Sequence, residues 1–170
     1  MFLCSGKEAR QYFAGRPTSI RIIEIASAQS IRLGMDCHQI QLCDRPQQIE
    51  LSQLQDLFQR AAFWATDRRS EELAIAIRHS NPVISAWDGD RLVGFARATS
   101  DGIYRATIWD VVIHPDYQGA GLGRKLVETV LSHPHMSRVE RVYLMTTHQQ
   151  SFYEKIGFEV NSTTTMVLLN

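Results

Sequence analysis

Apolar residues in the first half of the chain recur every three to four positions, which is the period of a helix with one buried face. This spacing predicts one helix over 50–62 and a second helix from Glu71 onward, with Ser70 as its N-cap. Ile40–Cys43 precedes the two helices as a short strand, and Ile20–Ile25 is a candidate for an extra strand.

The second half of the chain favours strands, because β-branched and apolar runs alternate there with turn signals. Three strands are expected over Pro82–Trp87, Arg91–Ala98 and Tyr104–Ile113, followed by a glycine-rich loop and an amphipathic helix. The remaining expected elements are a strand, a short helix and a closing hairpin, over Val139–Met145, Gln149–Ile156, Phe158–Val160 and Thr164–Leu169. This order predicts an N-terminal arm over 1–45 and one α/β domain over 46–170 with a mixed, mostly antiparallel sheet.

Composition narrows the classes of partner that the protein is expected to bind. The chain has 170 residues, and its 18 Lys and Arg residues balance 18 Asp and Glu residues. Neither nucleic acid nor a membrane is expected as a partner, because both require basic clusters or long apolar stretches. The 3 cysteines match no disulfide framework and no zinc pattern. We therefore expect a cytoplasmic protein without a metal site.

The stretch after the longest expected strand predicts a site for an anion. Gly119, Gly121 and Gly123 stand between a strand that ends at His114 and the amphipathic helix. Glycines let the backbone approach a ligand closely because they carry no Cβ. Free N–H groups at the start of a helix favour a phosphate. We therefore expect this loop to bind a pyrophosphate.

Two general phosphate-binding patterns do not fit this loop. Counted from Gly119, the P-loop and the dinucleotide-binding pattern both need glycine at position 124, where the chain has Arg124. The pattern Gln/Arg-x-x-Gly-x-Gly/Ala is met by Gln118, Gly121 and Gly123. With this pattern, the segment resembles the acyl-CoA loop of the GCN5-related N-acetyltransferases, the GNAT family.

A second segment carries the same resemblance. Ser151–Phe158 reads as a helix that ends at Gly157 before a strand, and it is similar to the closing motif of the GNAT family. The resemblance covers roughly 51–169 and implies a single GNAT domain whose splayed central strands hold acetyl-CoA as cosubstrate. It implies that these residues bind acetyl-CoA: Val111, Val112, Ile113, Gln118, Gly119, Ala120, Gly121, Leu122, Gly123 and Arg124.

The resemblance also implies direct attack of an amine on the thioester, without an acyl-enzyme. Tyr153 matches the tyrosine of the closing motif, which implies a role as the acid; core packing is its other interpretation. Asp110 is the candidate base, and its alternative role is that of a hydrogen-bonded structural carboxylate. Because 146–150 contains no carboxylate, His148 or a chain of waters remains a further candidate for the base.

The acceptor is expected to be a primary amine. The runs Gly94–Gly102 and Ile108–Val112 look like the plastid and cyanobacterial branch of the family, which is linked to serotonin, related arylalkylamines and protein lysines. The candidate acceptor-binding residues are Trp64, Tyr104 and Trp109, for which ordinary core packing is the alternative. We expect a small arylalkylamine such as serotonin or tryptamine. Protein lysine acetylation, a non-catalytic acetyl-CoA-binding regulatory module and a homodimer remain open.

Overall fold

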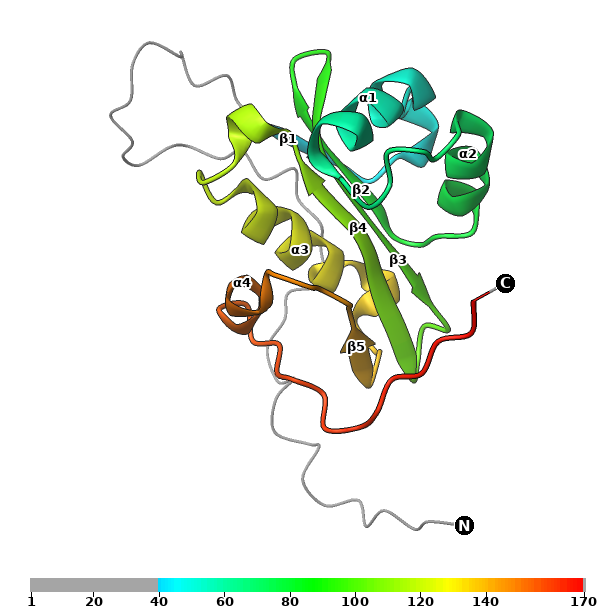
Figure 1. Cartoon of the computed structure of the whole chain (residues 1–170), viewed down its shortest axis with the longest axis vertical. Helices are drawn as coiled ribbons and strands as arrows, with labels where there is room; N and C mark the ends of the chain where they lie inside the picture. Colours follow the sequence, from blue (N-terminus) through cyan, green and yellow to red (C-terminus); the bar gives the residue numbers. More distant parts are fainter. Residues whose placement is uncertain (1–39, 170) are drawn as a thin grey trace.

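The computed structural model describes residues 40–169 (Figure 1). The expected arm over 1–45 therefore lies largely outside the described residues, as does the candidate strand Ile20–Ile25. Short 3-10 turns occupy Pro46–Gln48, Pro115–Tyr117 and Pro134–Met136. The strands and α-helices, in chain order, are β1 (Gln41–Cys43), α1 (Leu51–Ala61), α2 (Ser70–Arg78), β2 (Val83–Asp88), β3 (Arg91–Ser100), β4 (Arg105–Ile113), α3 (Leu122–Ser132), β5 (Arg141–Tyr143) and α4 (Gln150–Glu154).

The strands form one mixed sheet in the order β1-β2-β3-β4-β5. The first three pairings are antiparallel, and β4 pairs with β5 in parallel. The parallel pair follows from the connection, because α3 carries the chain from the end of β4 back to the start of β5. The expected single α/β domain with a mostly antiparallel sheet is confirmed.

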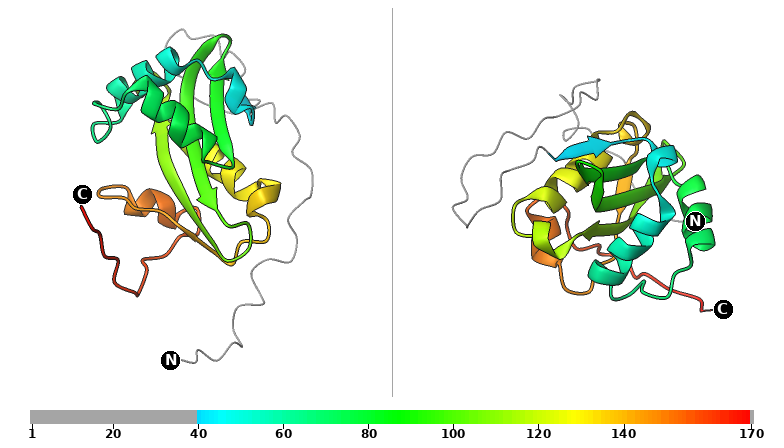
Figure 2. Two further views of the ribbon diagram at one scale, coloured as in Figure 1. Left: turned by 90° about the vertical axis from the view of Figure 1, so that its right-hand side faces the viewer. Right: turned by 90° about the horizontal axis from the view of Figure 1, so that it is seen from above.

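Each face of the sheet carries its own apolar core. α1 and α2 lie on one face, where Leu54, Phe58 and Leu73 pack against strand residues (Figure 2). α3 lies on the opposite face, where Leu126 and Val130 are 0% exposed. α1 and α3 bury apolar residues that recur at helical spacing. The amphipathic patterns in the sequence therefore correctly identified the buried faces of these helices.

β4 contains a β-bulge near its end. Phe95 pairs with Val112, and Arg97 pairs with Trp109. One residue of β3, Ala96, therefore stands opposite two residues of β4, Asp110 and Val111. Asp110 accommodates the extra residue with φ +53°, a left-handed conformation that costs a non-glycine residue roughly 1–3 kcal/mol. The bulge turns two consecutive side chains, Trp109 and Asp110, toward the same face, where both contact Arg97.

The two parallel strands separate soon after they begin. β5 pairs with β4 only at Arg105–Thr107, and the expected strand over Val139–Met145 is therefore shorter than predicted. β4 continues through Ile113 beyond the last pair. Among residues 40–169, the backbone of 108–113 consequently has no strand partner on the side of β5.

Two local expectations were wrong. Ser70 does not cap α2, because the helix begins at Ser70 itself and its hydroxyl donates to Gln55 Oε1 of α1 at 2.7 Å. The expected closing hairpin is absent, because 158–169 contains no strand within the described residues. β5 pairs over only three residues and so offers a short edge to a following strand. The Asn161 side chain also holds a local turn, because its amide donates to Thr163 Oγ1 at 2.8 Å and its Oδ1 accepts from the Thr163 N–H at 3.3 Å.

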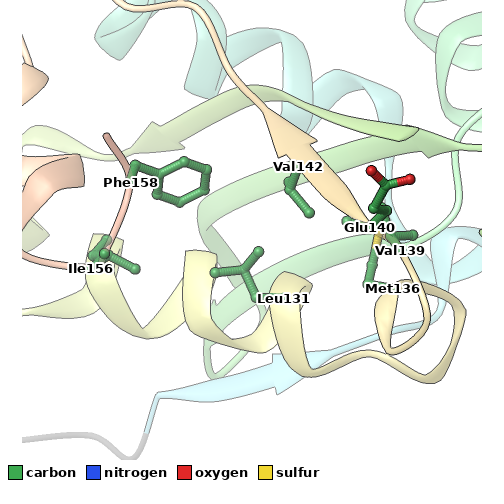
Figure 3. A pocket seen from close by; sticks show the side chains of 8 residues that line it. Leu131, Met136, Val139, Glu140, Val142, Ile156 and Phe158 are labelled. Atoms are coloured by element: carbon green, nitrogen blue, oxygen red, sulfur yellow. The ribbon is translucent and has the colours of Figure 1, made fainter. Parts of the chain in front are cut away.

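A small cavity lies between the end of α3, the start of β5 and the chain after α4. Its volume is about 170 Å³, and most of its lining side chains are apolar (Figure 3). The lining residues are Leu131, Met136, Val139, Glu140, Val142, Ile156, Gly157 and Phe158. It borders the C-terminal end of α3, so it is separate from the glycine loop at the other end of that helix.

Candidate functional site

The glycine loop has the geometry that an anion requires. Gly119 and Gly121 adopt φ +80° and +85°, and a Cβ on either would meet no atom within 4 Å. The first backbone bond of α3 runs from the Lys125 N–H to the Gly121 carbonyl at 3.1 Å. The N–H groups that precede Lys125 therefore have no carbonyl of the helix to bind, and they can bind a phosphate in the open space beside the loop.

Side chains hold the start of this loop in place. The Gln118 amide donates to the carbonyl of Ile113 at 2.9 Å, which ties the loop to the end of β4. One residue earlier, the Tyr117 hydroxyl donates to Asp88 Oδ2 at 2.5 Å, and this bond raises the pKa of Tyr117. Gln118, the first residue of the glycine pattern, thus fixes where the loop begins.

His114 is buried at the junction of β4 and the loop. Arg91 Nη2 lies 2.8 Å from its Nε2, and Asp116 Oδ2 lies 3.5 Å from its Nδ1. Burial, followed by the charge of Arg91, lowers the pKa of His114. Because a guanidinium can only donate, Nε2 accepts from Arg91, and on the other side of the ring the Asp116 backbone N–H donates to Nδ1 at 3.3 Å.

α4, which carries Tyr153, approaches the start of α3 and the end of β4. A Cβ on Gly123 would lie 3.5 Å from the Phe152 ring and 3.6 Å from Ile113, so α3, α4 and β4 meet at this point. Tyr153 stacks edge-on against Phe152 and Phe158, with ring centroids 4.9 and 5.9 Å away. Burial raises the pKa of the Tyr153 hydroxyl, which therefore stays protonated at neutral pH.

The end of the short helix follows its sequence signal. Gly157 adopts φ +103°, and its N–H donates to the Glu154 carbonyl at 3.0 Å. The next N–H, of Phe158, donates to the carbonyl of Tyr153 at 3.1 Å. The predicted glycine stop of this helix is confirmed.

Asp110 lies on the α1/α2 face of the sheet between two arginines. Arg68 Nη1 is 2.8 Å from Oδ1 and Arg97 Nε is 2.7 Å from Oδ2, while the carboxylate side chain is only 5% exposed. Sequence reasoning did not identify either arginine. The pairing of Arg97 opposite Trp109 is inferable from a hairpin register, whereas nothing in the sequence points to Arg68, which approaches from a loop.

The three aromatic candidates come from three different segments of the chain. Trp64 is half exposed in the α1–α2 connection and stacks edge-on against Phe63 at 5.1 Å. Trp109 lies under Arg97 and donates to Thr99 Oγ1 at 2.8 Å. Tyr104 is 63% exposed just before β4. A strand rises about 3.4 Å per residue, so Tyr104 stands roughly 17 Å along the strand from Trp109.

The last candidate from the sequence is His148, and the expectations about a metal and a membrane concern the whole described chain. His148 is exposed on the connection between β5 and α4. Among residues 40–169, no group of three His, Cys, Asp or Glu side chains could hold a metal ion. In the same range, no helix has both the length and the apolar character needed to cross a bilayer.

These elements fit the cosubstrate that the sequence motif implies. The N–H groups at the start of α3 could hold the pyrophosphate, because the space that faces Gly119 and Gly121 is open. The unpaired edge of 108–113 offers backbone groups to an extended, amide-containing chain such as pantetheine. The Tyr153 side chain belongs to the same region, beyond Phe152.

Comparisons with known proteins identify the domain. The acetyltransferase (GNAT) domain family matches residues 79–160. A protein of that family from Xanthomonas campestris superimposes with a TM-score of 0.68 at 25% identity, covering 79% of this chain and 96% of its own.

Relatives of known sequence include proteins of a red alga and of plants. The uncharacterized N-acetyltransferase ycf52 of Porphyra purpurea is 43% identical over 96 residues, which is 54% of this chain and 55% of the relative. Serotonin N-acetyltransferase 2 of rice is 32% identical over 118 residues, covering 66% and 58% of the two chains. Histone acetyltransferase TAP1 of soybean is 43% identical over 72 residues, covering 42% and 31%. The aligned region thus spans less than two thirds of each relative. Residues 79–160 form an acetyltransferase domain of the GNAT family.

Proposed function

We propose that the protein transfers the acetyl group of acetyl-CoA directly to the nitrogen of a primary amine, and that this amine is a small arylalkylamine such as serotonin or tryptamine. One observation supports this proposal: the free N–H groups of the glycine loop, the unpaired edge of β4 and the short helix that carries Tyr153 lie at one end of the sheet. Each serves a different part of an acyl-CoA reaction, namely phosphate binding, pantetheine binding and proton transfer.

Bound acetyl-CoA supplies a thioester that an uncharged amine attacks, and the residues of the chain organise that reaction. The backbone from Gly119 to Arg124 holds the pyrophosphate, and the backbone of Val111–Ile113 orients the pantetheine arm. Tyr153 is the proposed acid, because its raised pKa keeps the proton that the leaving thiolate requires.

The aromatic side chains of the α1–α2 connection support an aryl acceptor. Phe63 and Trp64 are 75% and 50% exposed, although large aromatic side chains usually bury most of their surface. The connection is joined to the bulge of β4 through Arg68 and Asp110 at 2.8 Å. The rice relative of this protein is named a serotonin N-acetyltransferase, and serotonin is an indole amine, which supports an indole acceptor.

A protein lysine is the second candidate acceptor. The soybean relative is named a histone acetyltransferase, and its aligned stretch is more similar to this chain than that of the rice enzyme. The exposed pair Phe63 and Trp64 would also suit a macromolecular partner.

The test is thiol release from acetyl-CoA across a panel of tryptamine, serotonin, tyramine, spermidine and a lysine-containing peptide. Turnover with the aryl amines alone would support the proposal, and turnover with the peptide alone would move the assignment to protein acetylation. If no amine of the panel causes thiol release although the protein binds acetyl-CoA, a regulatory module without turnover would be favoured. A Gly121→Glu variant, designed to lose acetyl-CoA binding, is the negative control.

A further inference from the structure

Both carboxylate oxygens of Asp110 are engaged by arginine side chains. Its Oδ1 faces Arg68 Nη1 at 2.8 Å and its Oδ2 faces Arg97 Nε at 2.7 Å. The Asp110 side chain is 5% exposed, that of Arg68 is 34% exposed and that of Arg97 is 15% exposed. Water therefore competes poorly for the carboxylate. Charge-assisted bonds of this length are among the strongest hydrogen bonds in proteins. The carboxylate is thus held in two ion pairs, which is the setting of a structural carboxylate.

The cluster formed by Arg68, Arg97 and Asp110 joins three segments that are distant in sequence. Arg97 belongs to β3, Asp110 to the bulge of β4, and Arg68 to the α1–α2 connection. Arg97 also donates to Ser80 Oγ at 3.1 Å, just after α2. The cluster therefore holds both ends of α2 against the centre of the sheet.

Arg68 is itself seated by neighbours on α1. Its guanidinium lies over the Phe58 ring at 5.5 Å, and its carbonyl accepts from Gln55 Nε2 at 3.4 Å. The same connection presents Phe63 and Trp64 to solvent. The position of these two rings relative to β4 thus depends on Arg68 and its carboxylate partner.

We propose that Asp110 is a positioning residue and not the catalytic base. Through Arg68 it fixes the α1–α2 connection against the bulge of β4, and it thereby sets where the aromatic ring of the acceptor lies relative to the thioester. This inference rests on the proposed acetyltransferase function. Its consequence is that loss of Arg68 impairs use of the acceptor while leaving acetyl-CoA binding intact.

The experiment compares Arg68→Ala, Arg68→Lys and Asp110→Asn with a matched control. The control is Arg60→Ala, which removes an ion pair of similar length, 2.7 Å from Asp56 on the exposed face of α1. The readouts are kcat and KM for the amine, Kd for acetyl-CoA, the pH–rate profile, and amide hydrogen exchange of residues 62–69. Exchange is measured on the free protein and needs no acceptor.

Arg68→Ala is expected to raise the KM for the acceptor about tenfold, because small misplacements of a substrate are costly. Kd for acetyl-CoA should stay within about twofold, exchange of 62–69 should accelerate, and the pH midpoints should not move. Arg68→Lys should recover part of the KM, and Arg60→Ala should behave as wild type.

Two results would overturn the inference. Wild-type KM and wild-type exchange in Arg68→Ala would show that the link does not position the connection. Loss of the acid limb of the pH profile in Asp110→Asn, with exchange unchanged, would make Asp110 the base. If wild type acetylates no amine, the proposed function fails separately, and exchange still shows whether the cluster holds the connection.

Discussion

The glycine loop offers the most direct test of acetyl-CoA binding, through Gly121. It is the N-cap of α3 with φ +85° and ψ −1°, and a Cβ there meets no atom within 4 Å. Gly121→Ala therefore creates no clash, and its cost is conformational. An L-residue in this region is about 1–2 kcal/mol less favourable than glycine, which lowers Tm by roughly 2–8 °C for a chain of this size.

The effect on acetyl-CoA binding is separate from this loss of stability. If the loop relaxes to a negative φ, the N–H groups before Lys125 no longer converge. Each hydrogen bond lost to a charged phosphate costs about 1.5–3 kcal/mol, which corresponds to roughly ten- to hundredfold in Kd. Gly121→Glu adds a negative charge at the same point, so its loss of affinity should exceed that of Gly121→Ala.

The assay combines titration calorimetry with acetyl-CoA and thermal unfolding without ligand. Gly102→Ala is the matched control, because Gly102 has φ +78° in the turn before β4, at the opposite end of that strand from the loop. Both alanine variants should lose comparable stability, and only Gly121→Ala should lose affinity. Unchanged acetyl-CoA affinity in Gly121→Ala and Gly121→Glu would refute the assignment of this loop as the pyrophosphate site.

Three further predictions concern other parts of the molecule. Tyr153→Phe should lower kcat about a hundredfold with acetyl-CoA affinity unchanged; a wild-type kcat would remove Tyr153 as the acid. Burial raises the pKa of Tyr153, so its hydroxyl stays protonated above the usual tyrosine pKa of about 10. The activity of the wild-type protein should therefore persist to alkaline pH, and steady-state rates measured across pH check this. His114 has a lowered pKa and is protonated more readily when unfolded, so stability should fall as pH drops through about 6.5; His114→Gln should flatten this dependence in urea unfolding. Leu126→Ala, at a site that is 0% exposed, should cost about 2–5 kcal/mol of unfolding free energy, measured in the same way.

The sequence by itself determined the features that depend on neighbouring residues. Helical spacing identified the buried faces of α1 and α3, because amphipathic periodicity is a local property. The glycine pattern located the loop, and Gly119 and Gly121 do adopt the left-handed conformation that favours glycine. Gly157 ends its helix for the same local reason.

Tertiary structure alone decided which distant side chains meet. Asp110 was a candidate base by its place in the sequence, yet the bulge turns it toward Arg97 and a loop brings Arg68 to its other oxygen. Tyr104, grouped with the other aromatic residues by composition, stands at the far end of the strand. The expected hairpin after Phe158 is absent because a strand needs a partner edge, and β5 ends after Tyr143. A local pattern specifies conformation, whereas partners depend on how the strands align and separate.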